Sequence, residues 1–195
     1  MGEIGGVVKN DGSPVVLDGY NLIAYDWYNG ILGMQSHLVQ PDKSMRVTNV
    51  TIDYNTKTQY VTLSDGTCIE SDVTEHMREP CVPASSKLLT SSYLGFGNNA
   101  LHINVWEYLK PGTDNIVKLA VTDPGCIPVI EASYGTMKGG KTDIVYFITD
   151  FQPGIAQPEL LAKPTFPCRR QGANDEDIPD DLVRSIKSVK QIYSH

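Results

Sequence analysis

The chain has 195 residues, enough to bury a sizeable hydrophobic core in one domain, with or without a tail. Hydrophobic residues make up 41% and charged residues 20% of it, which argues against wholesale disorder, and no apolar run reaches the roughly 18 residues that a membrane-spanning helix needs. The formal net charge of −7 and the scattered lysines and arginines speak against a nucleic-acid-binding surface.

Residues 1–19 predict a flexible arm or an edge segment ahead of the folded domain. They are rich in glycine, and they show neither the basic start nor the apolar stretch of a signal peptide. On this reading the sequence belongs either to a cytosolic protein or to a mature chain with an added methionine. Gly6 stands where a myristoylation signal requires serine or threonine, which argues against that modification.

From Tyr20 onward, short runs of β-branched and aromatic residues are separated by turn signals, a pattern typical of an antiparallel all-β domain. Asn29-Gly30 predicts a hairpin turn because both residues tolerate positive φ. Apolar and polar side chains alternate at residues 47–54, and a turn at 55–58 leads to a returning strand at 59–63. This hairpin is the clearest element in the sequence.

Further strands are expected at residues 100–108, 116–121 and 143–151, and a loop is expected at 81–92. The strand at 143–151 is apolar on both faces. Such a strand is either buried on both sides or lines a cavity.

The C-terminal residues 171–195 predict an acidic linker followed by an amphipathic helix. Apolar residues recur there at helical spacing, behind a proline and acidic residues and with lysines late in the run: Leu182, Val183, Ile186, Val189 and Ile192. We expect this helix to pack on the domain, with a partner-binding or dimerising helix as the alternative.

The cysteines are an even number without a close CxxC pair: Cys68, Cys81, Cys126 and Cys168. This pattern favours two disulfides in an oxidising compartment. There are two alternatives. The first is a zinc site that includes His76, and the second is a cytosolic protein in which the thiols stay reduced. Asn49-Val50-Thr51 matches the N-glycosylation sequon on the polar face of its strand, which adds support for secretion.

The sequence contains no nucleophile elbow, phosphate-binding loop, metalloprotease helix or EF-hand loop. The carboxylates considered for acid-base chemistry are Asp123, Asp143 and Asp150. A role as solvated turn residues is favoured over a catalytic role for them. We therefore expect a protein that is not an enzyme, has no catalytic residue and uses no organic cofactor.

Several short stretches, in chain order, resemble the ependymin family. Residues 122–129 look like its Gly-Cys-x-Pro region, and residues 50–61 are similar to its first long hairpin. Residues 149–168, with a short Pro-led helix at 158–161, resemble its C-terminal segment. Together the similar stretches extend from about residue 22 to residue 168.

The resemblance implies an all-β domain at residues 20–170, in which antiparallel strands form two stacked sheets curled into a half-open barrel with one or two short helices, like the bacterial lipoprotein-localisation proteins. It also implies a secreted or lysosomal glycoprotein, often homodimeric and associated with calcium. By family position Cys81 pairs with Cys168. Cys68 would then pair with Cys126, because the usual N-terminal partner of Cys126 is missing here.

Two functions follow as hypotheses. The first is binding of a lipid or other hydrophobic ligand in a β-sheet pocket, with an ordinary packed core of the same residues as the alternative. The second is an extracellular-matrix or cell-adhesion glycoprotein that acts by calcium-linked self-association, with glycan at Asn49 and acidic residues 174–181 as weak calcium ligands. The expected pocket residues are Tyr25, Trp27, Ile52, Tyr60, Ile103, Val105, Ile144, Tyr146 and Ile148.

Overall fold

The all-β expectation is confirmed by the computed structural model of the chain, which describes residues 2–9, 12, 14–40, 42–110, 113–137 and 140–170. The elements in these ranges are strands and two short 3-10 helices, and no α-helix occurs among them. In chain order they are β1 (Gly2–Lys9), β2 (Pro14–Asp26), β3 (Ile31–Val39), β4 (Met45–Asp53), β5 (Thr58–Thr62), β6 (Cys68–Asp72), β7 (Lys87–Leu94), η1 (Gly97–Asn99), β8 (Leu101–Leu109), β9 (Ile116–Thr122), β10 (Pro128–Met137), β11 (Gly140–Phe147), η2 (Pro158–Leu161) and β12 (Arg169–Arg170).

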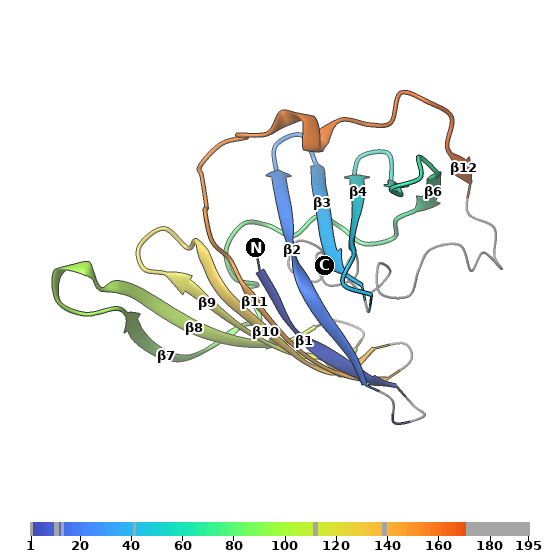
Figure 1. Ribbon diagram of the computed structural model, residues 1–195. Helices are drawn as coiled ribbons and strands as arrows, with labels where there is room; N and C mark the ends of the chain where they lie inside the picture. The colour runs from blue at the N-terminus through green and yellow to red at the C-terminus, as the bar shows by residue number, and fades with distance from the viewer. Residues whose placement is uncertain are drawn as a thin grey trace. The chain divides into compact units, whose positions relative to one another are not determined.

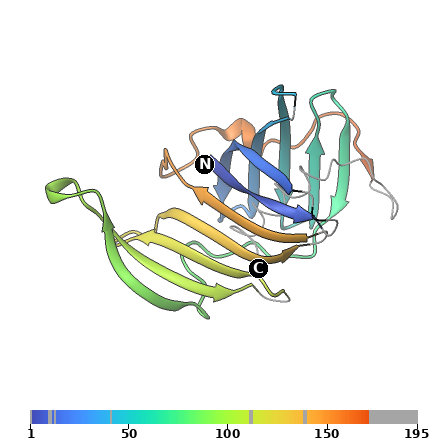
Figure 2. The same ribbon diagram turned by 60° about the horizontal axis from the view of Figure 1, so that its bottom comes forward.

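The chain divides into two compact units. Unit 1 comprises Met1–Asp18 and Glu79–Phe151, and unit 2 comprises Gly19–Arg78 and Gln152–His195. Neighbouring strands follow the order β1-β11-β10-β9-β8-β7 in unit 1 and β2-β3-β4-β5-β6-β12 in unit 2, to which β2 belongs from Gly19 onward (Figures 1 and 2). The pairing of β12 with β6 is parallel, and the other described pairings are antiparallel.

The hairpin expected at residues 47–63 is confirmed as β4 and β5, and it supplies much of the core of unit 2. Val50 pairs with Val61, and the same row continues to Met34 on β3 and Ile69 on β6. All four side chains are buried. Because successive residues of a strand point to opposite faces, this row and the parallel row through Ile52 lie on one face of the sheet and form its core.

The other face of the unit 2 sheet is more covered than the alternation predicts. Thr51 and Asp53 were expected on a polar face, yet they are only 5% and 4% exposed. The reason is that residues 158–163, which we call the strap, run across β3 and β4. The strap consists of η2 and the two residues that follow it, and η2 confirms the short Pro-led helix expected at this position.

The core of unit 1 lies on one face of its sheet. The buried cluster contains Tyr108, Val117, Leu119 and Val121 from β8 and β9. Trp106, Val82 and Cys126 pack against this cluster. On β9, alternate residues from Val117 to Val121 share this face, as the period of two requires.

Three sequence expectations differ from the structure or lie outside it. Residues 1–19, expected to form a flexible arm, include β1 and the start of β2, and β1 pairs with β11 along its length. The expected loop at 81–92 is wrong in its second half, where β7 begins at Lys87. The expected C-terminal helix falls in residues 171–195, outside the described residues, and the half-open barrel stays a prediction.

The expected number of disulfides is confirmed, but both expected pairings are wrong. The bridges are Cys68–Cys168 in unit 2 and Cys81–Cys126 in unit 1, with Cα–Cα separations of 4.6 and 5.2 Å. Cys68 begins β6 and Cys168 directly precedes β12, and the register pairs Ile69 with Arg169. Strand pairing thus places Cys168 opposite Cys68, whereas each predicted bridge would join cysteines of different units.

Candidate functional site

The residues expected to line a pocket are divided between the two units. Unit 2 contains four of them, Tyr25, Trp27, Ile52 and Tyr60. Unit 1 contains the other five, Ile103, Val105, Ile144, Tyr146 and Ile148. A pocket that draws residues from both units remains a prediction. Within each unit, however, the strand register shows which of them share a face.

In unit 2 the expected residues lie on both faces of the sheet. Tyr25 pairs with Leu32, which pairs with Ile52, so these side chains share the core face. The Tyr25 hydroxyl donates a hydrogen bond to the backbone carbonyl oxygen of Arg78. Tyr60 pairs with Thr51 and therefore lies on the strap face, while Trp27 lies in the turn between β2 and β3.

In unit 1 the register also separates the expected residues. Tyr146 pairs with Glu131, which pairs with Leu119, and all three side chains are buried on the core face. Val105 pairs with Ala120 and Ile103 with Thr122, which places Ile103 and Val105 on the opposite face. The structure therefore does not bring Ile103 and Val105 together with Ile144 and Tyr146.

That opposite face of unit 1, which we call the outer face, carries large apolar side chains in contact with solvent. The small residues Ala120 and Ala132 lie near its middle. A cross-strand ion pair joins Lys118 to Glu107 at 3.9 Å, and the Lys118 ammonium lies 5.9 Å from the centre of the Tyr134 ring. The exposed apolar side chains of this face are Leu94, Leu101, Leu109, Ile116, Tyr134 and Phe147.

Sequence reasoning named Ile103 and Val105 of this face but missed its exposed apolar side chains. The exposed side chains lie toward two ends of this face, with Leu109, Ile116 and Tyr134 at one end and Leu94 and Leu101 at the other; Ile103, Ala120 and Ala132 between them are buried. Exposed apolar patches mark sites that contact a ligand, a membrane or another protein. The available signal was β8, in which Leu101, Ile103 and Val105 are apolar on one side while Trp106 and Tyr108 are apolar on the other. The outer face is the best candidate surface for function in unit 1.

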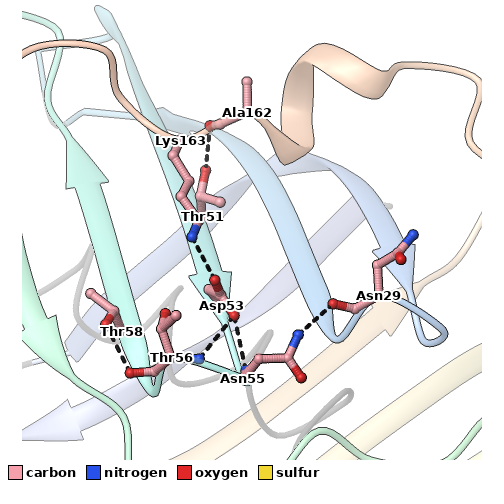
Figure 3. Close-up of polar contacts among 8 residues, drawn as sticks. All are labelled: Asn29, Thr51, Asp53, Asn55, Thr56, Thr58, Ala162 and Lys163. Atoms are coloured by element: carbon pink, nitrogen blue, oxygen red, sulfur yellow. Dashed lines mark hydrogen bonds and ion pairs between the residues drawn. The ribbon is translucent and has the colours of Figure 1, made fainter.

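In unit 2 the strap is fastened to the sheet by polar contacts at the end of β4 (Figure 3). The Lys163 ammonium lies 2.6 Å from the Asp53 carboxylate, and the Thr51 hydroxyl donates a hydrogen bond of 3.1 Å to the Ala162 carbonyl oxygen. The Asp53 carboxylate also accepts hydrogen bonds from the backbone amides of Asn55 and Thr56. One carboxylate therefore stabilises both the β4–β5 turn and the strap.

The environment of this ion pair shifts both pKa values. Burial raises the pKa of Asp53, but hydrogen bonds from Lys163, Thr56 and Asn55 outweigh it and hold the pKa below the usual 3.8. The hydrogen bond from Lys163 to Asp53 raises the pKa of the lysine above its usual 10.5. Both shifts mean that the charged forms of these residues stabilise the folded protein.

Asp53→Asn should lower the free energy of unfolding near neutral pH by about 1 kcal/mol, because it removes the charge but keeps an acceptor for the turn amides, and solvent screens the half-exposed Lys163. The lowered pKa of Asp53 means that this contribution is present above pH 3.8 and lost as the pH falls through the folded-state pKa. It also fades above pH 10.5, as the pH rises through the folded-state pKa of Lys163.

Urea unfolding of both proteins from neutral pH down to about pH 2 tests this dependence. The difference between wild type and variant should shrink in acid. A difference that stays constant over the whole range would show that the ion pair does not stabilise the fold.

The sequon residue Asn49 lies exposed on β4, on the strap face, two residues before Thr51. Its side-chain oxygen accepts a hydrogen bond of 3.0 Å from the Gln35 side-chain amide, and Gln35 is partly buried. The exposed Asn49 side chain is open to glycan attachment. Its attachment remains a prediction.

The described ranges test the zinc alternative but not the calcium expectation. The zinc alternative with His76 is wrong, because all four cysteines form disulfides. No group of three or more His, Cys, Asp or Glu side chains is arranged to hold a metal ion within the part of the chain that the structure describes. The acidic residues 174–181, expected as calcium ligands, lie outside that part.

Comparison with known proteins places these features in a family context. The Ependymin family model matches residues 42–168, well over half of the chain. The chain is also similar to ependymin-related protein 2 of Haliotis asinina, with 30% identity over 99 residues. That match covers 49% of this chain and 49% of the relative, so the chain spans about half the length of the curated relative it matches. Among the helices of the described residues, none is long and apolar enough to cross a membrane.

Proposed function

The chain belongs to the ependymin family, and from this premise we propose that it is a secreted, non-enzymatic protein that binds a lipid or another apolar ligand. Its two disulfides are consistent with the secretory pathway. The observation that carries the proposal is the outer face of unit 1, where large apolar side chains remain in contact with water.

An apolar ligand that covers this face would remove its apolar side chains from water, and this burial favours binding. Each buried CH₂ group contributes about 0.8 kcal/mol, so an alkyl chain laid across several strands gains several kcal/mol. The ion pair of Lys118 and Glu107 lies among the apolar side chains of the face, with both side chains partly exposed. It supplies polar atoms that could orient the headgroup of an amphiphilic ligand.

A fluorescent fatty acid titrated into detergent-free protein tests the assignment of the face. Leu109 and Ile116 are exposed neighbours paired across β8 and β9, and replacing both by serine should weaken binding about tenfold, because two apolar contacts are lost. The matched control is Phe166→Ser, which alters an exposed apolar residue of unit 2. Equal affinity in all three proteins would remove the outer face as the ligand site.

The same exposed apolar side chains also suit the second candidate function, an adhesion or matrix glycoprotein that works by self-association. A second copy of the chain would bury them as a ligand does. Calcium would act through residues outside the described ranges. Native mass measured with and without a calcium chelator distinguishes the two functions, since only calcium-linked self-association predicts a loss of dimer on chelation.

A further inference from the structure

The β7–β8 hairpin of unit 1 has an unusual composition. Residues 88–106 contain no Asp, Glu, Lys or Arg, although charged residues make up 20% of the chain. Lys87 and Glu107 are the charged residues at its two ends. Exposed strands of soluble proteins usually carry charges that prevent association, and this hairpin carries none.

The hairpin is exposed as well as uncharged. Strand β7 is the last strand of the unit 1 sheet, and all eight of its residues are exposed. In both views the turn that joins it to β8 reaches beyond the neighbouring turn between β9 and β10 (Figures 1 and 2). The apolar residues of this region that contact solvent are Leu88, Leu89, Tyr93, Leu94, Phe96 and Leu101.

An aromatic side chain stands at the tip of the hairpin. Phe96 lies between Gly95 and Gly97, which have φ of 88° and 57°, and the backbone amide of Asn99 donates to the Phe96 carbonyl oxygen at 3.2 Å. The two glycines permit the left-handed backbone that this tight turn requires. The Phe96 side chain is 83% exposed as a result.

We propose that the tip of the β7–β8 hairpin, residues 93–101, inserts into the interface of a phospholipid membrane with neutral headgroups. Aromatic and aliphatic side chains are the ones that enter this interface with favourable free energy. The tip has no basic residue to attract anionic lipids, and a chain of net charge −7 would be repelled by them. Docking on a membrane goes beyond holding a ligand, and the hairpin can dock whether or not a ligand is bound.

Pairing of β7 with a second copy of the chain fits the tip less well. Leu94 and Leu101 form the last pair of the hairpin register. Strand addition along β7 would bury residues up to that pair but would leave Phe96, beyond it, in water. Insertion of the tip into a membrane buries Phe96 first.

Flotation of the purified protein with phosphatidylcholine vesicles tests the proposal. Phe96→Asp should lower the vesicle-bound fraction about tenfold or more, because it places a charge where the chain enters the apolar boundary. The matched control is Tyr28→Asp, the same kind of change at an aromatic residue that is 97% exposed in a turn of unit 2. This control should bind vesicles like the wild type.

Two further readouts identify the cause of binding. Phe96→Trp should keep vesicle binding, and its added fluorescence should shift to shorter wavelength on contact with lipid. Binding of the wild type should change little with salt, since no charge is involved. No flotation of the wild type, or equal flotation of Phe96→Asp, would overturn the proposal. A vesicle-independent dimer that Phe96→Asp dissociates would assign the hairpin to self-association instead.

Failure of this proposal is distinguishable from failure of the proposed function. Phe96→Asp should take up a soluble fluorescent fatty acid as the wild type does, because its side chain lies at the hairpin tip, beyond the paired strands of the outer face. If vesicle binding is lost and ligand uptake is kept, both proposals stand. If neither the wild type nor Phe96→Asp takes up the fatty acid, but the wild type still floats with vesicles and the variant does not, membrane docking alone stands.

Discussion

Replacing Cys68 and Cys168 together by serine should lower the free energy of unfolding by about 4 to 5 kcal/mol, the largest effect that we expect from any change. The bridge joins cysteines 100 residues apart, and closing such a loop restricts the unfolded chain by about 4.7 kcal/mol in the chain-entropy account. It also holds β12 beside β6 at the edge of the unit 2 sheet. Urea unfolding of the two proteins measures the difference.

The matched control is the double serine variant of Cys81 and Cys126. That bridge spans 45 residues, so the same account gives about 4 kcal/mol. Peptide mapping of the oxidised protein should recover Cys68 linked to Cys168 and Cys81 linked to Cys126. A peptide linking Cys81 to Cys168 would contradict the structure and restore the pairing inferred from family resemblance.

Gly33→Ala should destabilise the protein by about 2 to 3 kcal/mol and loosen the strap. A Cβ atom built on Gly33 collides with the backbone carbonyl oxygen and carbon of Leu160, and backbone atoms cannot move aside as a flexible side chain can. Either the strap shifts away from β3 or the strand bends. Limited proteolysis should therefore cut residues 152–163 faster in the variant, and urea unfolding gives the loss of stability.

Gly66→Ala provides the control for this change. Gly66 has a positive φ of 85°, and nothing lies within 4 Å of an added Cβ, so only the conformational cost of about 1 kcal/mol applies. Its strap should resist the protease like that of the wild type. Equal cleavage of the strap in wild type and Gly33→Ala would show that the close approach of Leu160 to β3 does not hold the strap.

Much of the sheet structure could be predicted because it depends on local alternation. Val50 and Ile52 are buried as the period of two requires, and Asn29-Gly30 forms the expected turn, with Gly30 at a φ of 64°. Strand β7 was missed because its serines and threonine resemble a loop in composition. Its apolar residues are exposed at the edge of a sheet, so burial imposes no alternating pattern on them.

Contacts between distant segments could not be predicted from the sequence. The burial of Thr51 and Asp53 depends on a strap more than a hundred residues further along the chain, and no local pattern encodes that contact. Gly33 in the interior of β3 was an available signal, since a glycine within a strand often marks close approach of another backbone. The disulfide pairing likewise depends on which strands become neighbours, here β6 and β12.

For the candidate site, the sequence predicted the apolar character of the residues but not which of them share a face of the sheet. Ile103 and Val105 were expected to contact an apolar ligand, and they do lie on the outer face, but Ile144 and Tyr146 lie on the other side of the same sheet. Alternation assigns the residues of one strand to two faces, yet it does not say which face of one strand matches which face of the next. That assignment needs the register.

The claim that this family member carries an apolar ligand is tested most directly by mass spectrometry of protein secreted from cells and purified without detergent. Native and denaturing spectra of the same sample are compared, and an organic extract identifies what is released. We predict small-molecule masses that are present in the native spectrum and lost on denaturation, and that are reduced in the Leu109→Ser, Ile116→Ser double variant. A ligand-free native mass, together with no uptake of added fatty acid or phospholipid, would contradict the account.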